Sequence, residues 1–142
     1  MEKLSLRRET TLKSLATLKE SLELMKTEAA KNYHRSFRDS VIQRFKYTFD
    51  TLWKYCAVFL TQIKKTPFEK IGSPRTVFSL LHKEALITDI ELTTFYQMLE
   101  YRNNTTHTYR ESIAEAILHE TQRYYDLMIA VTKRLEEDIP HA

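Results

Sequence analysis

Hydrophobic residues recur every three or four positions through most of the chain, which is the period of an amphipathic helix. The first such segment covers about Glu2–Thr27, and the second covers about Tyr33–Ile63 and is roughly 45 Å long at 1.5 Å per residue. The apolar positions of the first segment are Leu12, Leu15, Leu18, Leu22 and Met25. Those of the second are Phe37, Val41, Phe45, Phe49, Leu52, Cys56, Leu60 and Ile63, with Trp53 and Phe59 widening the stripe.

The segment "TPFEKIGSPRTVF" separates the second helix from the next one. Thr66 and Glu69 fit a capping box for a short turn, and Gly72 suits a left-handed C-cap. Ser73, followed by proline, predicts the start of a helix over about Pro74–Leu86, because proline is favoured at the first helical position.

Two further capping boxes predict the remaining helices. Thr88 with Glu91 opens a helix that runs toward Arg102, and Thr108 with Glu111 opens the last helix, which reaches about residue 136. The apolar positions of the last helix are Ile113, Ile117, Tyr124, Met128, Val131 and Leu135. These five helices with short connections predict an antiparallel bundle.

Composition supports an all-α fold. The 142 residues include a single glycine and three prolines, too few for the turns of a many-stranded protein. We therefore predict one domain, residues 1–142, folded as an antiparallel four- to five-helix up-and-down bundle. Cys56, the only cysteine, falls in the apolar stripe of the second helix and is expected to be buried.

Several classes of site are disfavoured by the sequence. One glycine leaves no Gly-rich phosphate loop, and the histidines lack ligand spacing with one another or with Cys56, so neither a metal nor a cofactor is expected. The N-terminus is charged where a signal peptide needs an apolar run, and no uncharged run approaches the roughly 20 residues that a bilayer requires. We expect a cytoplasmic soluble protein without membrane contact.

The candidate chemistry lies in "RNNTTHTY", residues 102–109, at the polar break between the last two predicted helices. Helices joined by a short loop run antiparallel, so Arg102 and His107 are expected to be neighbours. With Thr108 as N-cap, the free N–H groups of the next helix would point toward the same place and favour an anion. Arginine can hold phosphate and histidine can exchange a proton near neutral pH, although both residues are also common as ordinary caps and loop residues.

The same residues carry a resemblance. "RNNTTHTY" is similar to the R-N-x-x-x-H-x-Y signature of the HEPN superfamily. More narrowly, residues 72–111, "GSPRTVFSLLHKEALITDIELTTFYQMLEYRNNTTHTYRE", resemble the bacterial nucleotidyltransferase substrate-binding protein family within it.

The resemblance implies a homodimeric helical bundle that assembles with a cognate minimal nucleotidyltransferase. Relatives with this motif act as toxins of toxin–antitoxin pairs and cleave RNA without a metal. By that likeness, Arg102 and His107 would be catalytic and Asn103 would orient the site. Tyr109, with Thr108 beside it, would receive AMP from the partner, and the modification would block the site.

Two other functions fit the same residues. In the first, the chain is a non-catalytic subunit that binds a nucleotide or another substrate for the nucleotidyltransferase. In the second, the motif mainly organises a dimer interface. A basic run on the second helix, formed by Arg35, Arg38, Arg44 and Lys46, could follow an RNA backbone, but the interspersed Asp39 favours an ordinary solvated face.

Overall fold

The computed structural model describes residues 1–140, and within this range the chain is all-α. In chain order its elements are α1 (Glu2–Leu24), α2 (Glu28–Asn32), α3 (His34–Gln62), η1 (Phe68–Lys70), α4 (Pro74–Lys83), α5 (Asp89–Asn104), η2 (Thr105–His107) and α6 (Glu111–Glu137). η1 and η2 are single 3-10 turns. None of the helices formed by residues 1–140 is long and apolar enough to cross a membrane.

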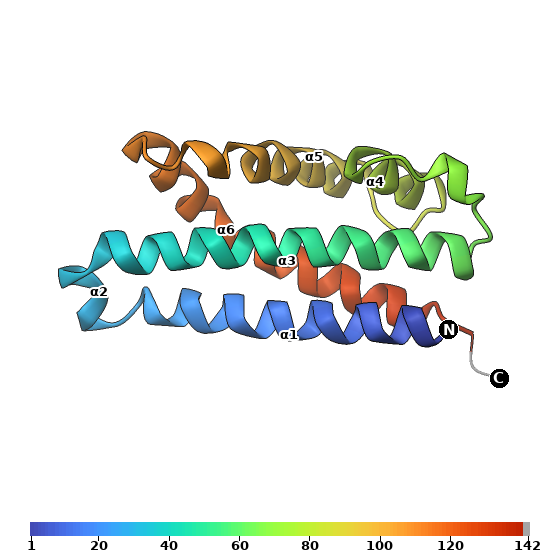
Figure 1. The fold of residues 1–142 in the computed structure, drawn as a ribbon, viewed down its shortest axis with the longest axis horizontal. Helices are drawn as coiled ribbons and strands as arrows, with labels where there is room; N and C mark the ends of the chain where they lie inside the picture. The colour runs from blue at the N-terminus through green and yellow to red at the C-terminus, as the bar shows by residue number, and fades with distance from the viewer. Residues whose placement is uncertain (141–142) are drawn as a thin grey trace.

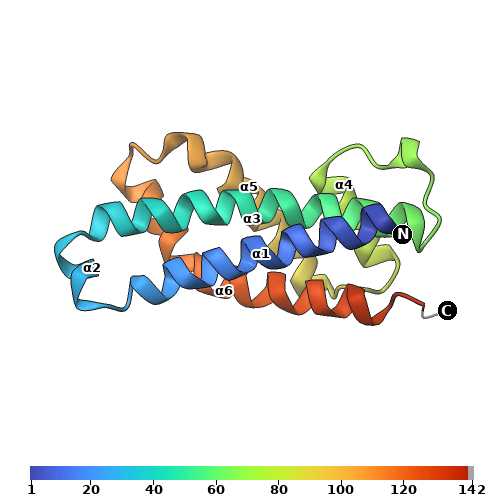
Figure 2. The ribbon, with the colours of Figure 1, turned by 60° about the horizontal axis from the view of Figure 1, so that its bottom comes forward.

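The four longest helices form an antiparallel bundle with α3 at its centre (Figure 1). α1 and α6 pack against α3 and against each other, while α4 and α5 cover another side of α3. Figure 2 shows α1 and α6 side by side, with α5 and α4 behind α3. The predicted all-α bundle is therefore confirmed. The five-residue α2 is an additional helix, too short to produce the periodic pattern from which the others were predicted.

The core is built from the predicted apolar stripes and is rich in aromatic rings. Phe45, Phe49, Phe78 and Phe95 are fully buried, and the rings of Phe78 and Phe95 stack with centroids 4.3 Å apart. Burial of this kind supports a packing role for the aromatics of α3. Cys56 is also fully buried, and its removal from water raises the pKa of the thiol, so this side chain stays protonated.

Small polar residues line the contact between α1 and α3. Thr11 is buried, and its hydroxyl donates to the carbonyl of Thr51 on α3 at 3.2 Å. Thr48 is buried too and donates across the contact to the carbonyl of Ser14 at 3.2 Å. Leu12, predicted to lie on the buried face of α1, is instead 37% exposed, because the face that meets α3 is centred on its neighbour Thr11.

The connection between α3 and α4 differs from the prediction. Gly72 does not adopt a left-handed conformation; in this connection the positive φ angle belongs to Lys65 (58°). The capping box of Thr66 with Glu69 is also wrong. The backbone N–H of Thr66 instead donates to the carbonyl of Leu60, which closes the end of α3, and η1 has no side-chain cap.

Two predicted caps are confirmed. The Ser73 hydroxyl accepts a hydrogen bond from the backbone N–H of Thr76, with proline next in the sequence, and α4 follows. Thr88 and Glu91 form a full capping box at the start of α5, in which each side chain accepts from the other residue's backbone N–H. Both helices begin where the sequence predicts.

Candidate functional site

The last turn of α5, η2 and the start of α6 form the predicted break, which we call the α5–α6 junction (residues 102–110). α5 extends past Arg102 to Asn104, and η2 continues the turn. The hydroxyls of Thr105, Thr106 and Thr108 each donate to the carbonyl three residues earlier. The threonines therefore prolong a helical turn where the sequence suggested an irregular loop.

Thr108 is not the N-cap of α6, which corrects the third predicted capping box. Its backbone is helical (φ −72°, ψ −6°), whereas an N-cap is normally extended. The N-cap position falls on Arg110, which makes no side-chain cap, and α6 begins at Glu111. Glu111 cannot reach back to Thr108, because its carboxylate accepts a hydrogen bond from Arg38.

Arg38 is the centre of a charged cluster that holds α6 onto α3. The side chain is only 2% exposed, and its Nη1 atom donates to Glu111 at 2.5 Å and to Glu115 at 3.0 Å. Its Nε atom donates to Asp39 at 3.1 Å, and His34 lies 2.7 Å from the Glu115 carboxylate. Arg38 therefore neither lies on a solvated face nor follows an RNA backbone. The first two turns of α6 thus carry two carboxylates paired with Arg38, which disfavour an anion at this helix end.

The charges of this cluster stabilise one another. The hydrogen bonds that Arg38 donates to Glu111 and Glu115 raise its pKa against the opposing effect of its burial. The Arg38 guanidinium lowers the pKa of Glu111. Burial alone would raise the pKa of Glu115, but hydrogen bonds with His34 and Arg38 outweigh it, so that pKa is lowered. A sequence signal existed: Arg38 lies three and seven residues before Val41 and Phe45, on the buried face of the helix.

Arg102 points toward α3 and pairs with Asp50, a residue that the sequence did not single out. The Nε and Nη2 atoms of Arg102 donate to the two carboxylate oxygens of Asp50, both at 2.9 Å. This bidentate pair lies in a groove of about 430 Å³ that is also lined by Asn103, Trp53 and Lys54. Arg102 and Asn103 are thus brought together, and Asp50 already occupies the guanidinium edge that would otherwise be open to a phosphate.

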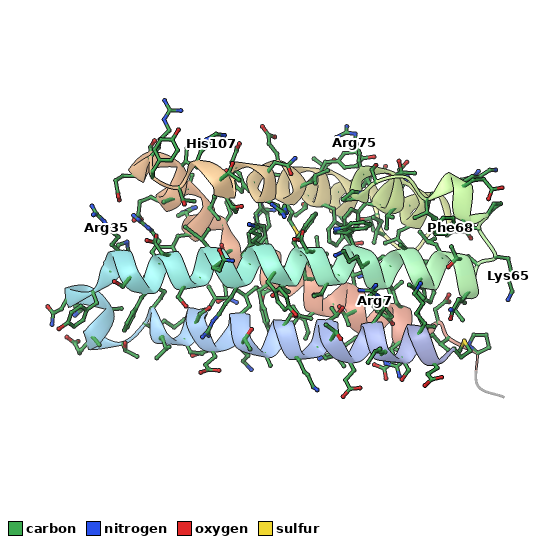
Figure 3. All side chains as sticks on the ribbon, in the orientation of Figure 1. Arg7, Arg35, Lys65, Phe68, Arg75 and His107 are labelled. Atoms are coloured by element: carbon green, nitrogen blue, oxygen red, sulfur yellow. The ribbon has the colours of Figure 1, made fainter. Side chains whose placement is uncertain are left out.

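His107 and Tyr109 form a second, separate group at the junction. Their ring centroids are 6.0 Å apart with planes at 74°, and Tyr109 is 76% exposed. Figure 3 shows His107 at the outer end of the layer formed by α4 and α5. Arg102 lines the groove beside Asp50, whereas His107 does not line it. That groove therefore does not gather the predicted catalytic pair.

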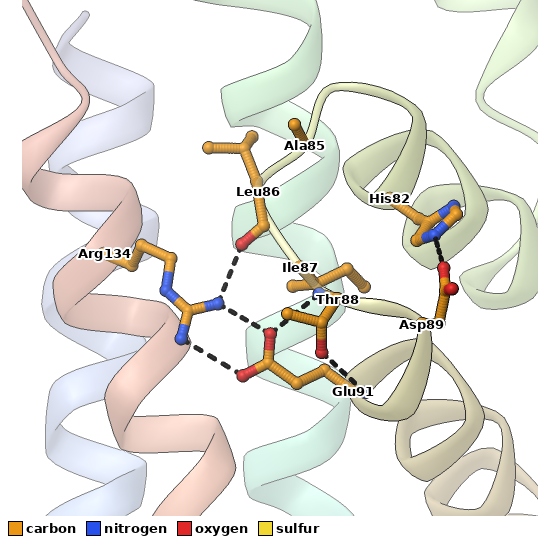
Figure 4. Close-up of a pocket in the computed structure, with 8 residues that line it drawn as sticks. All are labelled: His82, Ala85, Leu86, Ile87, Thr88, Asp89, Glu91 and Arg134. Atoms are coloured by element: carbon orange, nitrogen blue, oxygen red, sulfur yellow. Dashed lines mark hydrogen bonds and ion pairs between the residues drawn. The ribbon is translucent and has the colours of Figure 1, made fainter.

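Another groove lies at the other end of α5, between the α4–α5 turn and α6, and measures about 590 Å³ (Figure 4). Arg134 donates to the carbonyl of Leu86 and to both carboxylate oxygens of Glu91. His82 lies 2.5 Å from Asp89 across the same turn. The polar groups of this groove bond to one another, so it fastens α5 to α6. In residues 1–140, no group of three His, Cys, Asp or Glu side chains is placed to hold a metal ion.

Comparison with known proteins identifies the family. Residues 6–137 match the family described as nucleotidyltransferase substrate binding protein like. The chain belongs to this family. The match extends from α1 to the last residue of α6, so the α5–α6 junction lies inside the family fold.

Among solved structures, the chain resembles a protein from Thermus thermophilus, with 34% sequence identity and a TM-score of 0.78. The likeness covers 88% of this chain and 98% of the Thermus chain. None of the curated proteins matches the chain. The family name links the chain to a nucleotidyltransferase, and the shared fold extends over nearly the whole bundle.

Proposed function

We propose that this chain is the HEPN subunit of a two-component minimal nucleotidyltransferase system, and that it is a metal-independent ribonuclease neutralised by AMP transfer onto Tyr109. Membership of the nucleotidyltransferase substrate-binding family supports the pairing with such a partner. The observation that carries the proposal is the exposed contact between His107 and Tyr109, because modification of one ring would cover the other.

In the proposed cleavage, His107 takes the proton from an RNA 2′-hydroxyl, and the oxygen attacks the adjacent phosphorus. The bond to the 5′-oxygen breaks, leaving a 2′,3′-cyclic phosphate and a 5′-hydroxyl that receives a proton. A single histidine supplies only one of these two proton transfers. The proposal therefore includes a homodimer in which two junctions meet, so that His107 of a second copy protonates the leaving oxygen.

In the proposed neutralisation, the phenol oxygen of Tyr109 attacks the α-phosphorus of ATP in the active site of the partner. Pyrophosphate leaves, the phenol proton passes to a base, and a phosphodiester joins AMP to the ring. Tyr109 is 76% exposed, so its hydroxyl can enter another protein's active site without unfolding the junction. The added AMP would place bulk and negative charge beside His107.

A second candidate, the non-catalytic substrate-binding subunit, is favoured by the pairing of Arg102 with Asp50. An arginine whose donors are shared with a carboxylate is less available to stabilise charge on a phosphodiester. In this case the junction binds or presents a nucleotide to the partner, and no RNA bond breaks.

Cleavage of RNA in the presence of a chelator separates the two candidates. The purified protein should degrade single-stranded RNA with EDTA present, and His107→Ala should reduce the rate by about a hundredfold or more. His82→Ala is the control, because His82 is a half-exposed histidine of α4 that bonds Asp89 at the opposite end of α5. Saturable nucleotide binding with no loss of RNA would support the binding subunit, and equal cleavage by His107→Ala would reject the catalytic role.

A further inference from the structure

A groove between α1, α3 and η1 combines aromatic rings with unpaired cations. It measures about 270 Å³, near the lower end of the usual range of ligand pockets. Lys3, Arg7 and Lys54 line it, together with the rings of Trp53 and Phe68. No aspartate or glutamate of residues 1–140 lines this groove.

The three cations of this groove have no counter-charge in the described chain. Most of the arginines and several lysines form ion pairs, but across residues 1–140 Lys3, Arg7 and Lys54 form none. The Nζ atom of Lys54 lies 6.0 Å from the Trp53 ring centroid, so one positive charge is held beside an aromatic face. The groove therefore has a positive potential next to apolar surface.

Phe68 is exposed to an extent that packing does not explain. It is 79% exposed, although η1 is held by backbone hydrogen bonds from Lys70 to Pro67 and from Ile71 to Phe68. Lys65, with its left-handed backbone, turns the chain out of α3 just before this segment. Figure 3 shows Phe68 and Arg7 on the same half of the bundle, far from His107.

We propose that this groove binds a nucleotide unit, with its base against Trp53 and Phe68 and its phosphate on Lys3, Arg7 and Lys54. Aromatic faces accept any base by stacking, and nearby lysine and arginine residues neutralise the backbone phosphate. An uncharged aromatic ligand would leave the three cations unused, and inorganic phosphate would leave both rings unused. The site contains no residue of the motif at positions 102–109, so it stands apart from the proposed cleavage.

The groove also leads toward the motif. Trp53 and Lys54 line both this groove and the neighbouring one that contains Arg102 and Asn103. A nucleotide that is part of a single RNA strand could therefore continue along α3 toward Arg102. The same nucleotide chemistry could equally come from a free mononucleotide, and the experiment distinguishes these two sources.

Trp53 provides a built-in probe because it is the only tryptophan in the chain. Its fluorescence is titrated with AMP and with a single-stranded hexa-adenylate RNA, after correction for absorbance by the ligand. The His107→Ala background prevents cleavage of the oligomer, and a failure of the proposed ribonuclease activity leaves this measurement unaffected. Saturable quenching is expected. Equal saturation by AMP indicates a free nucleotide, and much tighter saturation by the oligomer indicates RNA.

Substitutions locate the binding. Phe68→Ala and Arg7→Gln should each weaken binding by roughly tenfold, and Arg7→Gln should also reduce the dependence of the affinity on salt. Ile90→Ala is the control for Phe68→Ala, because Ile90 is 80% exposed elsewhere on the surface. Lys19→Gln is the control for charge, since Lys19 is exposed on α1 about 24 Å from Lys3 by helical rise. Both controls should bind as the parent does.

Three results would overturn the proposal. The first is the absence of saturable quenching by either ligand, and the second is an affinity that Phe68→Ala and Arg7→Gln leave unchanged. The third is a fluorescence that changes with protein concentration alone and loses this dependence in Phe68→Ala, because the groove would then be covered by a second copy of the chain. Circular dichroism establishes that each variant remains folded.

Discussion

The two ends of α5 meet α6 in opposite ways. At the N-terminal end, Thr88, Glu91 and Arg134 bond to one another and to the backbone, so the turn has few donors left for a ligand. At the C-terminal end, His107 and Tyr109 contact each other and are otherwise exposed. Both ends are short connections, yet one fastens α5 to α6 and the other presents side chains to solvent.

This difference shows that the volume of a groove does not indicate which end of α5 is available to a ligand or partner. The larger groove, about 590 Å³, belongs to the fastened end, whose polar groups are mutually satisfied. The open end, at the C-terminus of α5, has the exposed phenol of Tyr109, which a partner enzyme would need to reach. If the proposed partner acts on this chain, exposed side chains indicate the site of action better than the volume of a groove does.

The largest expected effect concerns Tyr109. After incubation with the cognate nucleotidyltransferase and ATP, the wild-type chain should gain the mass of one adenylyl group, and Tyr109→Phe should gain none. Tyr47→Phe is the control, because Tyr47 is also exposed, at 57%, but lies on α3. Intact-mass and peptide mass spectrometry measure both. If Tyr109→Phe still gained the mass of one adenylyl group, Tyr109 would not be the acceptor of AMP.

Arg38 is expected to give the largest change in stability. Arg38→Met should lower the free energy of unfolding by about 2 kcal/mol, because the hydrogen bonds of a charged donor that joins α6 to α3 are lost. Arg35→Met removes a charge that is 73% exposed and pairs with Glu111, so its effect should stay within about 0.5 kcal/mol. Urea denaturation measures the two variants. Equal losses of unfolding free energy in the two variants would mean that the buried Arg38 guanidinium does not hold the start of α6 onto α3.

The two threonines that were both predicted as caps should differ. Thr88→Ala should cost about 1 kcal/mol, since it removes the side chain that accepts from the Glu91 backbone. Thr108→Ala should change the free energy of unfolding by less than about 0.5 kcal/mol, because its hydroxyl only donates to the Thr105 carbonyl. Thermal or urea unfolding of the pair tests this contrast. A larger loss in Thr108→Ala would contradict it.

The smallest effect is the pH dependence contributed by Glu91. The hydrogen bond from Arg134 lowers its pKa below the ordinary 4.5, so the unfolded chain binds more protons than the folded chain in that range. Its stabilising contribution is therefore complete above about pH 4.5 and is lost as the pH falls through the lowered pKa. Glu91→Gln should show a shallower decline of stability with acid than wild type. Exposed Glu137→Gln, the control, should follow the wild-type curve.

Local sequence patterns predicted a helix cap correctly where the two partners of the cap lie within one turn and bond to each other. Ser73 and the Thr88–Glu91 pair cap their helices because each partner lies within one turn. The Thr108–Glu111 pair has the same spacing but failed, since Glu111 is bound by Arg38 from a helix 73 residues away in the chain. A capping motif cannot reveal a competing partner that only the tertiary fold brings close.

The placement of the candidate residues, as distinct from their roles, was predicted in part. The sequence placed Arg102, Asn103, His107 and Tyr109 at one junction, and the structure divides them into one pair against α3 and one pair at the surface. The direction of a side chain at a helix end depends on which turn it occupies, and the threonines added a turn between Arg102 and His107. Asp50 gave no signal, because a single acid on a half-buried helical position resembles any solvated residue.

Because the Cys56 thiol is buried, the protein can be labelled with a dye at a single chosen position. With its only native cysteine inaccessible and protonated, a cysteine introduced at an exposed position would be the sole thiol to react with a maleimide dye. Dyes placed separately beside Phe68 and beside His107 would then report on which region of the molecule a bound strand or an arriving enzyme touches first.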